Sequence, residues 1–559
     1  MKALTRIGAL LAVMLLLAGP TTAGAQTDPT PTDVTSARTT EVQLLAINDF
    51  HGNLQPPFLR PTGVLIGGVE YLATHIKQLE ATNPNTLVVS AGDLIGASPL
   101  LSGLFHDEPT IESANLFGLD FNAVGNHEFD EGVTELLRMQ EGGCHPADGC
   151  QDGTPFLGAD FQFLAANVEW KDGSGTIFPP YKVVKFNGIK MALIGMTLED
   201  TPSIVTPSGI QDVNFHDEAD TVNALVPELR KKGIETIVVL VHEGGFPSAF
   251  DNTCPAISGP IIDIVNRTSD QVDLFVTGHT HQAYNCVIDG RPVTSAYQFG
   301  GMVSDIDMEV SRATGNPVAI KVNNRLITRD VPADSAQTQL IARWNTFAAE
   351  FSDRVVGSIT GDILRLNNAA GESALGDRIA DAQLWATRDV QGAQIAFMNP
   401  GGIRADLIYE NQAASEAPGE VTFGEVFAVQ PFQNTLVTMN LTGAQIDTLL
   451  EQQFDNPTVG SNRVLQVPEG FSYTWDALAP IGSKVDPATI QLNGAPIDPA
   501  GTYRITVNSF LADGGDNFAV LRNGTDRFSG SVDSEVFADY VGAHSPLTPG
   551  PQNRITRVN

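Results

Sequence analysis

Basic residues are scarce in this chain. Its 559 residues include 32 lysines and arginines against 65 aspartates and glutamates, which gives a formal charge of −33 at pH 7. A surface so acidic argues against a nucleic acid polymer or an anionic membrane as a partner, because both are bound through basic patches. A small anionic substrate would need local positive charge, supplied by arginines or by bound metal ions.

Cysteine is also rare: the four residues are Cys144, Cys150, Cys254 and Cys286. No CxxC pair is present, which disfavours a thiolate metal site, although the adjacent Cys144 and His145 leave a metal role open. In an exported protein an even number of cysteines favours disulfides, and four allow three connectivities. The short spacing favours Cys144–Cys150, which leaves Cys254–Cys286.

Long apolar runs are missing beyond the N-terminus. Lys2 and Arg6 precede an apolar segment at 7–18 that is too short for a mature membrane span, and small residues at 23–25 form a cleavage site. We therefore predict a signal peptide over 1–25, a disordered leader over 26–40, and a secreted protein of the periplasm or cell surface. No cysteine at the cleavage point could carry a lipid, and the last residues are polar, so we expect no membrane anchor.

Strand-like and helix-like segments alternate along the first half of the chain. The length exceeds what one core supports, so we expect two domains, and the alternation favours an α/β layered fold in the first. The predicted strands are 41–47, 86–90, 119–124, 190–195, 234–241 and 273–276. The predicted helices are 67–80, 111–117 and 221–232, and strand-like pieces over 287–328 close this domain.

Polar side chains stand just past most of these strands, where open α/β sheets place their chemistry. The segment Gly125–Asp130, taken alone, could be a simple helix cap. However, five of the ten histidines take this same position: His51, His127, His242, His279 and His281. Histidine, aspartate and asparagine side chains are ligands that suit zinc, manganese or iron. The strand ends carry too many of these side chains for a single ion with an open coordination position. We expect two divalent ions that share a bridging carboxylate.

The order of these motifs (Asp-x-His, Gly-Asp, Gly-Asn-His-Glu, His, Gly-His-Thr-His) resembles the calcineurin-like metallophosphoesterases, and the segments 48–52 and 125–130 resemble their 5′-nucleotidase branch. The resemblance implies a four-layer calcineurin-like β-sandwich, flanked by helices, over 41–330. It implies these metal ligands: Asp49, His51 and His281 for the first ion, Asn126, His242 and His279 for the second, and Asp93 between them. It makes His127, oriented by Asp130, the histidine that stabilises the phosphoryl transition state or assists the leaving oxygen. Glu128 and Glu243 are expected behind the ligands or in solvent.

A predicted helix separates the two domains. Asp334 and Ser335 favour an N-cap before an apolar helical pattern over 336–351. We expect a linker helix within 331–354, although a core helix of one domain fits this pattern equally well. The second domain then covers 355–559, with a helix over 372–385 and a buried strand over 394–398.

Three loops of the second domain are similar to those of the α+β 5′-nucleotidase C-terminal domain, whose role is substrate binding. Arginine suits phosphate, and two aromatic rings can sandwich a base, although either ring alone also fits a core. The resemblance implies these substrate-binding residues: Asn399, Arg404, Phe432, Asn434, Phe510 and Asp516. Family members often carry another arginine near the start of the helix over 372–385. Here Gly371 precedes the helix, and the nearest candidates are Arg365 and Arg378.

These features predict an exported enzyme that releases phosphate from nucleoside 5′-phosphates by attack of a metal-activated hydroxide. Two other reactions fit the same site: hydrolysis of 2′,3′-cyclic nucleotides and hydrolysis of UDP-sugars. A non-catalytic nucleotide-binding surface protein would be expected to lack some of the ligands, and none is missing.

Overall fold

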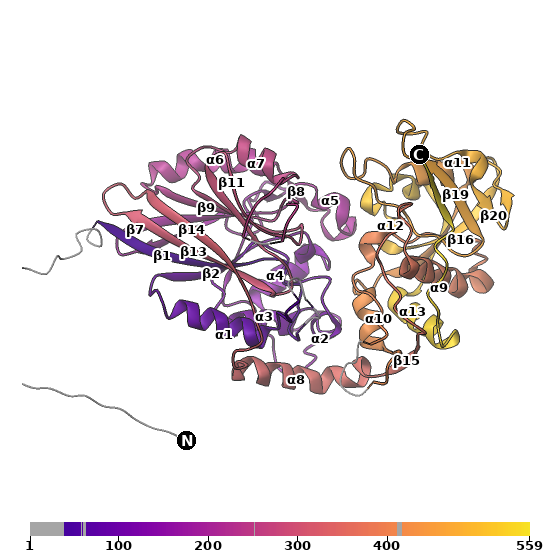
Figure 1. The fold of residues 1–559 in the computed structure, drawn as a ribbon, viewed down its shortest axis with the longest axis horizontal. Helices are drawn as coiled ribbons and strands as arrows, with labels where there is room; N and C mark the ends of the chain where they lie inside the picture. Colours follow the sequence, from indigo (N-terminus) through magenta and orange to yellow (C-terminus); the bar gives the residue numbers. More distant parts are fainter. Residues whose placement is uncertain (1–37, 57–58, 60–62, 251, 411–415) are drawn as a thin grey trace, which may run out of the picture.

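The computed structural model describes residues 38–56, 59, 63–250, 252–410 and 416–559 (Figure 1). The predicted signal peptide and most of the predicted leader lie outside these residues. Thr39 and Thr40, which we assigned to the leader, instead begin strand β1 (Thr39–Ile47), because they pair with Ser311 and Val310 of β13 (Met302–Ser311). No helix in the described ranges is long and apolar enough to cross a membrane.

Two six-stranded sheets organise the first half of the chain. The first contains, in spatial order, β14 (Pro317–Leu326), β13, β1, β2 (Thr86–Ser90), β3 (Phe121–Ala123) and β4 (Gln162–Leu164). The second contains β11 (Ala283–Ile288), β12 (Arg291–Ala296), β10 (Leu274–Thr277), β9 (Thr236–Val241), β7 (Ile189–Met196) and β6 (Tyr181–Phe186). Strands β1 to β4 run parallel, as do β7, β9 and β10. Their carboxyl ends therefore meet at one edge of each sheet.

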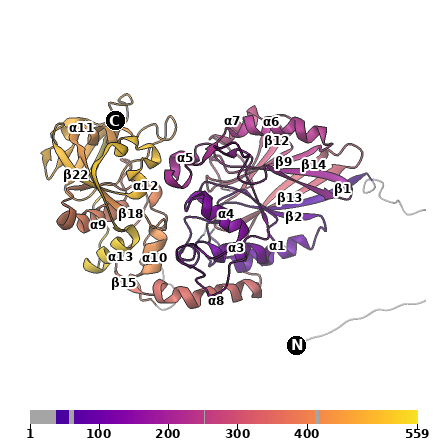
Figure 2. The ribbon, with the colours of Figure 1, turned by 180° about the vertical axis from the view of Figure 1, so that it is seen from behind.

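The two sheets pack face to face, and helices cover their outer faces (Figures 1 and 2). Alternate residues of β1 show the arrangement: Leu44 and Ala46 face the second sheet, whereas Leu45 and Ile47 face the helices. The first sheet is covered by α1 (Val69–Glu80), α3 (Glu108–Phe117) and α4 (Val133–Glu141), and the second by α6 (Glu218–Lys231) and α7 (Ile261–Arg267). The result is the predicted four-layer sandwich.

Helix α8 (Ser335–Ser352) connects the two halves of the chain and runs beneath both (Figure 1). The Asp334 carboxylate accepts hydrogen bonds from the backbone N–H groups of Ala336 and Gln337, as an N-cap does. The helix contacts α1, α3 and α2 (Leu100–Gly103) on one side and α10 (Phe423–Val429) on the other. Its Trp344 packs on Phe105, with 4.8 Å between ring centroids.

The second half of the chain is an α+β assembly. One sheet contains β16 (Ile395–Ala396), β22 (Thr502–Asn508), β18 (Thr435–Thr442) and β23 (Thr525–Val532). A second contains β21 (Ala495–Pro496), β20 (Gln491–Leu492), β19 (Phe471–Asp476) and β24 (Ile555–Val558), and β15 (Val355–Ser358) pairs with β17 (Glu420–Thr422). The helices include α9 (Ala374–Gln391), α10, α11 (Gly443–Glu451), α12 (Ser509–Ala512) and α13 (Asp533–Ala543).

Both predicted disulfides are present, Cys144–Cys150 and Cys254–Cys286. The first closes a loop after α4, and the second joins the segment after β9 to strand β11. Because Cys144 is bonded to Cys150, its thiolate is not a metal ligand, and the alternative was wrong for this residue.

Candidate active site

The strand-end residues of both sheets converge at one edge of the sandwich. Asp49 and His51 follow β1, Asp93 follows β2, and Asn126 and His127 follow β3. From the second sheet, His242 follows β9, and His279 and His281 follow β10. Five of these residues have φ values between 47° and 67°, a region that residues other than glycine seldom adopt: Asp49, His51, Asp93, His279 and His281. Such backbone strain concentrates at functional sites.

Asp49, His51 and His281 form the first cluster, with donor atoms all within 4.8 Å of one another. The His51 Nδ1–H donates to the carbonyl of Gly96 (2.8 Å), so Nε2 keeps its lone pair. That nitrogen lies 3.1 Å from Nε2 of His281, which is itself 3.3 Å from the Asp49 Oδ1. Burial lowers the pKa of His51 well below its usual value, so the ring is neutral and its Nε2 can donate an electron pair to a metal ion.

Asp93, His242 and His279 form the second cluster, again with donor atoms within 4.8 Å. The His242 Nδ1–H donates to the carbonyl of Ala91 (2.8 Å), which leaves Nε2 buried without an aligned hydrogen bond in the described part of the chain, although Asp93 Oδ2 is 2.9 Å away. Asn126 Oδ1 lies 3.0 Å from Nδ1 of His279. Burial lowers the pKa of His279 to about 3.

Both clusters fit a divalent ion. Ring nitrogens with free lone pairs face each other or face a carboxylate, an arrangement that a cation between them satisfies. Burial opposes a charge on His242, but Asp93 outweighs it and raises the pKa of this histidine to about 10, which reflects how strongly the site attracts positive charge. Asp93 Oδ2 also lies 3.6 Å from Nε2 of His51, so this carboxylate of the second cluster lies next to the first cluster as well.

Glu128 lies behind the clusters, which is one of the two positions expected for it; the other, in solvent, was wrong. Its buried carboxylate accepts hydrogen bonds from the backbone N–H groups of Asp93 (2.9 Å), Leu94 (2.8 Å) and Gly125 (2.6 Å). It therefore fastens the loop after β2 to the loop after β3. Burial, followed by the charge of Asp93, raises the pKa of Glu128 to about 7. Glu243 is buried as well, and burial raises its pKa to about 8.

His127 and Asp130 form a close pair beside the clusters. Nδ1 of His127 lies 2.9 Å and 3.0 Å from the two Asp130 carboxylate oxygens, and the His127 backbone N–H donates to Asp93 Oδ1 (2.9 Å). Burial favours the neutral ring, but the charges of Asp130 and Asp93 outweigh it and raise the pKa of His127. The geometry thus orients one ring nitrogen toward Asp130 and leaves the other available.

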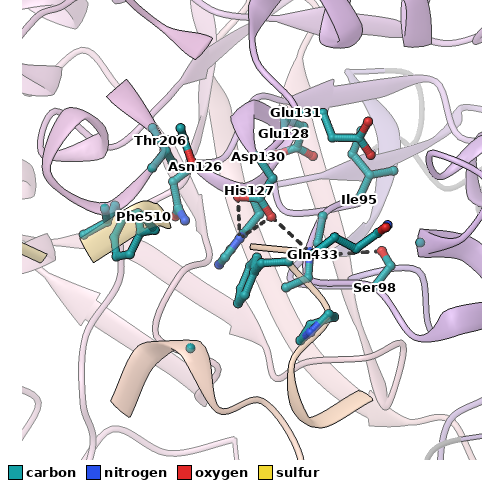
Figure 3. Close-up of a pocket in the computed structure, with 18 of the residues that line it drawn as sticks. Ile95, Ser98, Asn126, His127, Glu128, Asp130, Glu131, Thr206, Gln433 and Phe510 are labelled. Atoms are coloured by element: carbon teal, nitrogen blue, oxygen red, sulfur yellow. Dashed lines mark hydrogen bonds and ion pairs between the residues drawn. The ribbon is translucent and has the colours of Figure 1, made fainter. Parts of the chain in front are cut away.

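A cavity of about 430 Å³ opens beside the clusters and is lined by both halves of the chain. The first half contributes Asn126, His127, Asp130 and His279. The second half contributes all six predicted substrate-binding residues: Asn399, Arg404, Phe432, Asn434, Phe510 and Asp516. Figure 3 shows the His127–Asp130 pair and Phe510 on the cavity wall.

The two halves also match known protein families. Residues 42–283 match the calcineurin-like phosphoesterases, and residues 355–523 match the 5′-nucleotidase C-terminal domain. The cell wall protein Lmo0130 of Listeria monocytogenes is 32% identical over 539 residues, covering 90% of this chain and 67% of that protein. The chain belongs to the 5′-nucleotidase family of calcineurin-like phosphoesterases. The family resemblance inferred from the motifs is thereby confirmed.

Two further relatives, one sequence and one solved structure, align with nearly the whole of this chain. The endonuclease YhcR of Bacillus subtilis is 30% identical over 526 residues, which are 92% of this chain. The chain spans only 41% of YhcR. The solved structure of a 5′-nucleotidase precursor from Thermus thermophilus superposes with a TM-score of 0.77 at 29% identity, covering 93% of this chain and 100% of that one.

Arg404 stands over the ring of Phe432 at 5.8 Å, and the negative charges of Asp130, Asp93 and Asp49 in the first half of the chain act on it. Its guanidinium makes no hydrogen bond within the described ranges, so its donors are free for a ligand. Burial, followed by repulsion from Arg365, lowers the pKa of Arg404. Of the two further arginines considered, Arg365 donates to the carbonyl of Ile403 beside Arg404 (3.2 Å), whereas Arg378 is paired with Asp381.

Phe432 and Asn434 make contacts that the sequence did not predict. The Phe432 ring stacks on His127 from the other half of the chain, with centroids 5.6 Å apart and an interplanar angle of 18°. Asn434 Oδ1 accepts hydrogen bonds from the Ser509 hydroxyl (2.8 Å) and the Phe510 backbone N–H (3.2 Å). Asn434 therefore positions the start of α12, which carries Phe510.

A polar chain at the cavity wall includes two residues that the sequence prediction missed, Arg463 and Asn508. Asp516 Oδ1 lies 3.0 Å from Arg463 Nη1, and Asp516 Oδ2 accepts from Asn399 Nδ2 (2.8 Å). Asn399 Oδ1 in turn accepts from Asn508 Nδ2 (2.9 Å). Asn508 lies two residues before Phe510, which the resemblance had indicated. Arg463 lies outside every motif, so no signal in the sequence pointed to it.

Proposed function

We propose that this chain is an exported dinuclear-metal phosphohydrolase that releases phosphate from nucleoside 5′-phosphates. One observation carries the proposal: a cavity beside the two histidine–aspartate clusters is lined by His279 of the second cluster, by a half-buried arginine and by two phenylalanines. Metals suit a phosphate, and aromatic rings suit a base. The name of the Thermus thermophilus relative and the family match of residues 355–523 support the same substrate class.

Seven residues would hold two divalent ions such as zinc or manganese. Asp49, His51 and His281 would bind one, Asn126, His242 and His279 the other, and Asp93 would bridge them. When bound, such ions lower the pKa of a water molecule and neutralise charge on phosphoryl oxygens.

The remaining residues bind and orient the substrate. Arg404 has the planar fork that pairs with two phosphate oxygens, and the absence of a hydrogen-bond partner among the described residues leaves it free to do so. His127, held by Asp130, would place a positive charge or a proton at the phosphoryl group or the leaving oxygen. Phe432 and Phe510 would contact the base, and Asn399 and Asp516 would bind the sugar.

A substrate panel tests the proposal. Purified protein loaded with manganese or zinc would be given AMP, 2′,3′-cyclic AMP, UDP-glucose and single-stranded DNA, with products resolved by chromatography. We expect AMP to be hydrolysed with the highest kcat/KM, and an Asp49→Asn variant to be inactive on every substrate. Faster turnover of the cyclic nucleotide or UDP-glucose would overturn the substrate assignment. Internal cleavage of DNA would instead favour an activity like the one named for YhcR. If the metal-loaded protein turns over none of the four substrates, a nucleotide-binding protein without catalytic activity would be indicated instead.

A further inference from the structure

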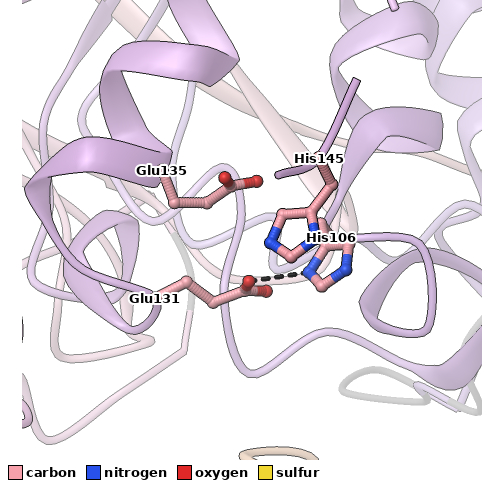
Figure 4. A group of neighbouring side chains, drawn as sticks. All are labelled: His106, Glu131, Glu135 and His145. Carbon is pink, nitrogen blue, oxygen red and sulfur yellow. Dashed lines mark hydrogen bonds and ion pairs between the residues drawn. The ribbon is translucent and has the colours of Figure 1, made fainter. Parts of the chain in front are cut away.

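A third group of potential metal ligands lies at the rim of the cavity, apart from the two clusters. Donor atoms of His106, Glu131, Glu135 and His145 all lie within 4.8 Å of one another, and Figure 4 shows the four side chains converging. Three of them, His106, Glu131 and Glu135, also line the cavity. His145 comes from the loop that the Cys144–Cys150 disulfide closes.

The two imidazoles share a carboxylate partner on one edge. Their rings stack with centroids 3.7 Å apart at 17°. Asp148 Oδ2 lies 2.8 Å from Nε2 of His106 and 3.4 Å from Nδ1 of His145. On the opposite edge, Nδ1 of His106 is 2.7 Å from Glu131. Metal-binding histidines usually present their second N–H to such a carboxylate, which fixes the tautomer and turns the other nitrogen toward the ion.

Negative charge is in excess around these rings. The carboxylates are Glu131, Glu135 and Asp148, and Arg138, which pairs with Glu135, is also paired with Glu108. Burial opposes a proton on His106, but Glu131 and Asp148 outweigh burial and raise the pKa of this histidine to about 9. The surroundings thus favour a positive charge at this point, and a divalent cation supplies more of it than a proton does.

We propose that His106, His145 and Glu131 bind a third divalent cation of the zinc type, with Glu135 as a fourth donor and Asp148 orienting both imidazoles. Two imidazoles with carboxylates form a donor set that zinc accepts. Each carboxylate oxygen has two acceptor positions, so Glu135 can contact Arg138 and a cation together. The Asp148 backbone N–H donates to Nδ1 of His145 (3.1 Å), so binding through Nε2 requires the ring proton to move to Nδ1 and face the Asp148 carboxylate.

The position of this site gives the ion a supporting role. His106 precedes Asp107, whose carboxylate accepts from the Gly96 backbone N–H (2.9 Å), and the Gly96 carbonyl accepts from His51. Glu131 follows Asp130, the partner of His127. A cation here would join the disulfide loop, the segment before α4 and the loop before α3 into one rim next to the catalytic residues.

Counting bound metal tests the proposal on the full chain. Protein stripped with a chelator would be reloaded with zinc, separated from free zinc by gel filtration and analysed by mass spectrometry for zinc per chain. We expect the double variant His106→Gln/His145→Gln to hold one zinc fewer than the wild type. The matched control is His216→Gln, because His216 pairs with Glu169 at the surface (3.3 Å), away from the cavity, and its zinc content should equal that of the wild type.

A second readout separates an ion site from a simple charge cluster. Zinc should raise the melting temperature of the wild type further than that of the double variant, because a ligand stabilises the state that binds it. Equal zinc content and equal zinc-dependent stabilisation in both proteins would overturn the proposal. If the double variant fails to fold, the single variant Glu131→Gln takes its place in both measurements, the zinc content per chain and the zinc-dependent rise in melting temperature. The difference in zinc count does not depend on catalysis, so it stands even if the proposed activity fails.

Discussion

Replacing Arg404 with alanine should separate activity from stability. The guanidinium lies in the cavity without a hydrogen bond within the described ranges, and it stands over the Phe432 ring. Burial lowers the pKa of Arg404, so the folded protein holds this charge at a cost. Phosphate would recover that cost by pairing with the free donors.

The size of the effect follows from those contacts. Removing a preorganised, charged donor from a buried site costs about 10²–10³-fold in rate. The loss of stability comes mainly from the cation–π contact, about 0.5–2 kcal/mol, and relief of the desolvated charge offsets it. We therefore expect Arg404→Ala to lower kcat/KM for AMP by about 10²–10³-fold while its melting temperature stays within a few degrees of the wild type.

Steady-state kinetics on AMP and thermal unfolding of the same preparations provide the assay, with metal content measured alongside. Arg404→Lys is the matched variant: it keeps the charge, loses the planar fork, and should recover part of the rate. Retained activity in Arg404→Ala would refute the role. A large fall in melting temperature, or lost metal, would refute the claim that this arginine serves the substrate and not the fold.

Three other variants test separate parts of the account. His127→Ala should keep its metal but lose about 10²–10⁴-fold in turnover, and full activity would remove His127 from catalysis. Arg463→Met should lower the preference for AMP over deoxy-AMP, because Asp516 loses its ionic partner; an unchanged ratio would show that Arg463 does not position it. Burial raises the pKa of Asp533 to about 8, above its value of about 4 in an unfolded chain. Stability should therefore fall as the pH rises from 4 through 8. Asp533→Asn should remove that part of the pH dependence of unfolding, and an unchanged profile would contradict the cause.

The sequence indicated which residues would lie close together, because of where they stand in the sheets. Parallel strands bring their carboxyl ends to one edge, so residues such as Asp93 and His242, far apart in the chain, could be expected to meet. The periodicity also located α8, since a capping aspartate and a run of apolar residues are local signals. The ends of helices and strands were predicted less accurately than their positions in the chain. Helix α3 begins at Glu108, before its apolar pattern becomes regular, and β1 begins within a polar segment because β13 pairs with it.

Contacts between distant segments were beyond the reach of local patterns. The burial of Glu128 depends on two loops that enclose its carboxylate, and nothing beside it in the sequence indicates this. Phe432 stacks on His127 only because the two halves of the chain meet at the cavity. Arg463 reaches Asp516 from a segment without a motif. In each case the partner is fixed by tertiary packing.

The most direct test of the central claim is phosphate release from AMP by the purified protein, before and after chelation and again after zinc or manganese is restored. We expect release that the chelator abolishes and the metal restores. We also expect that Asp93→Asn cannot be rescued in this way, because Asp93 belongs to one cluster and lies next to the other. Release that persists in the chelated protein, or full rescue of Asp93→Asn, would contradict the two-metal site.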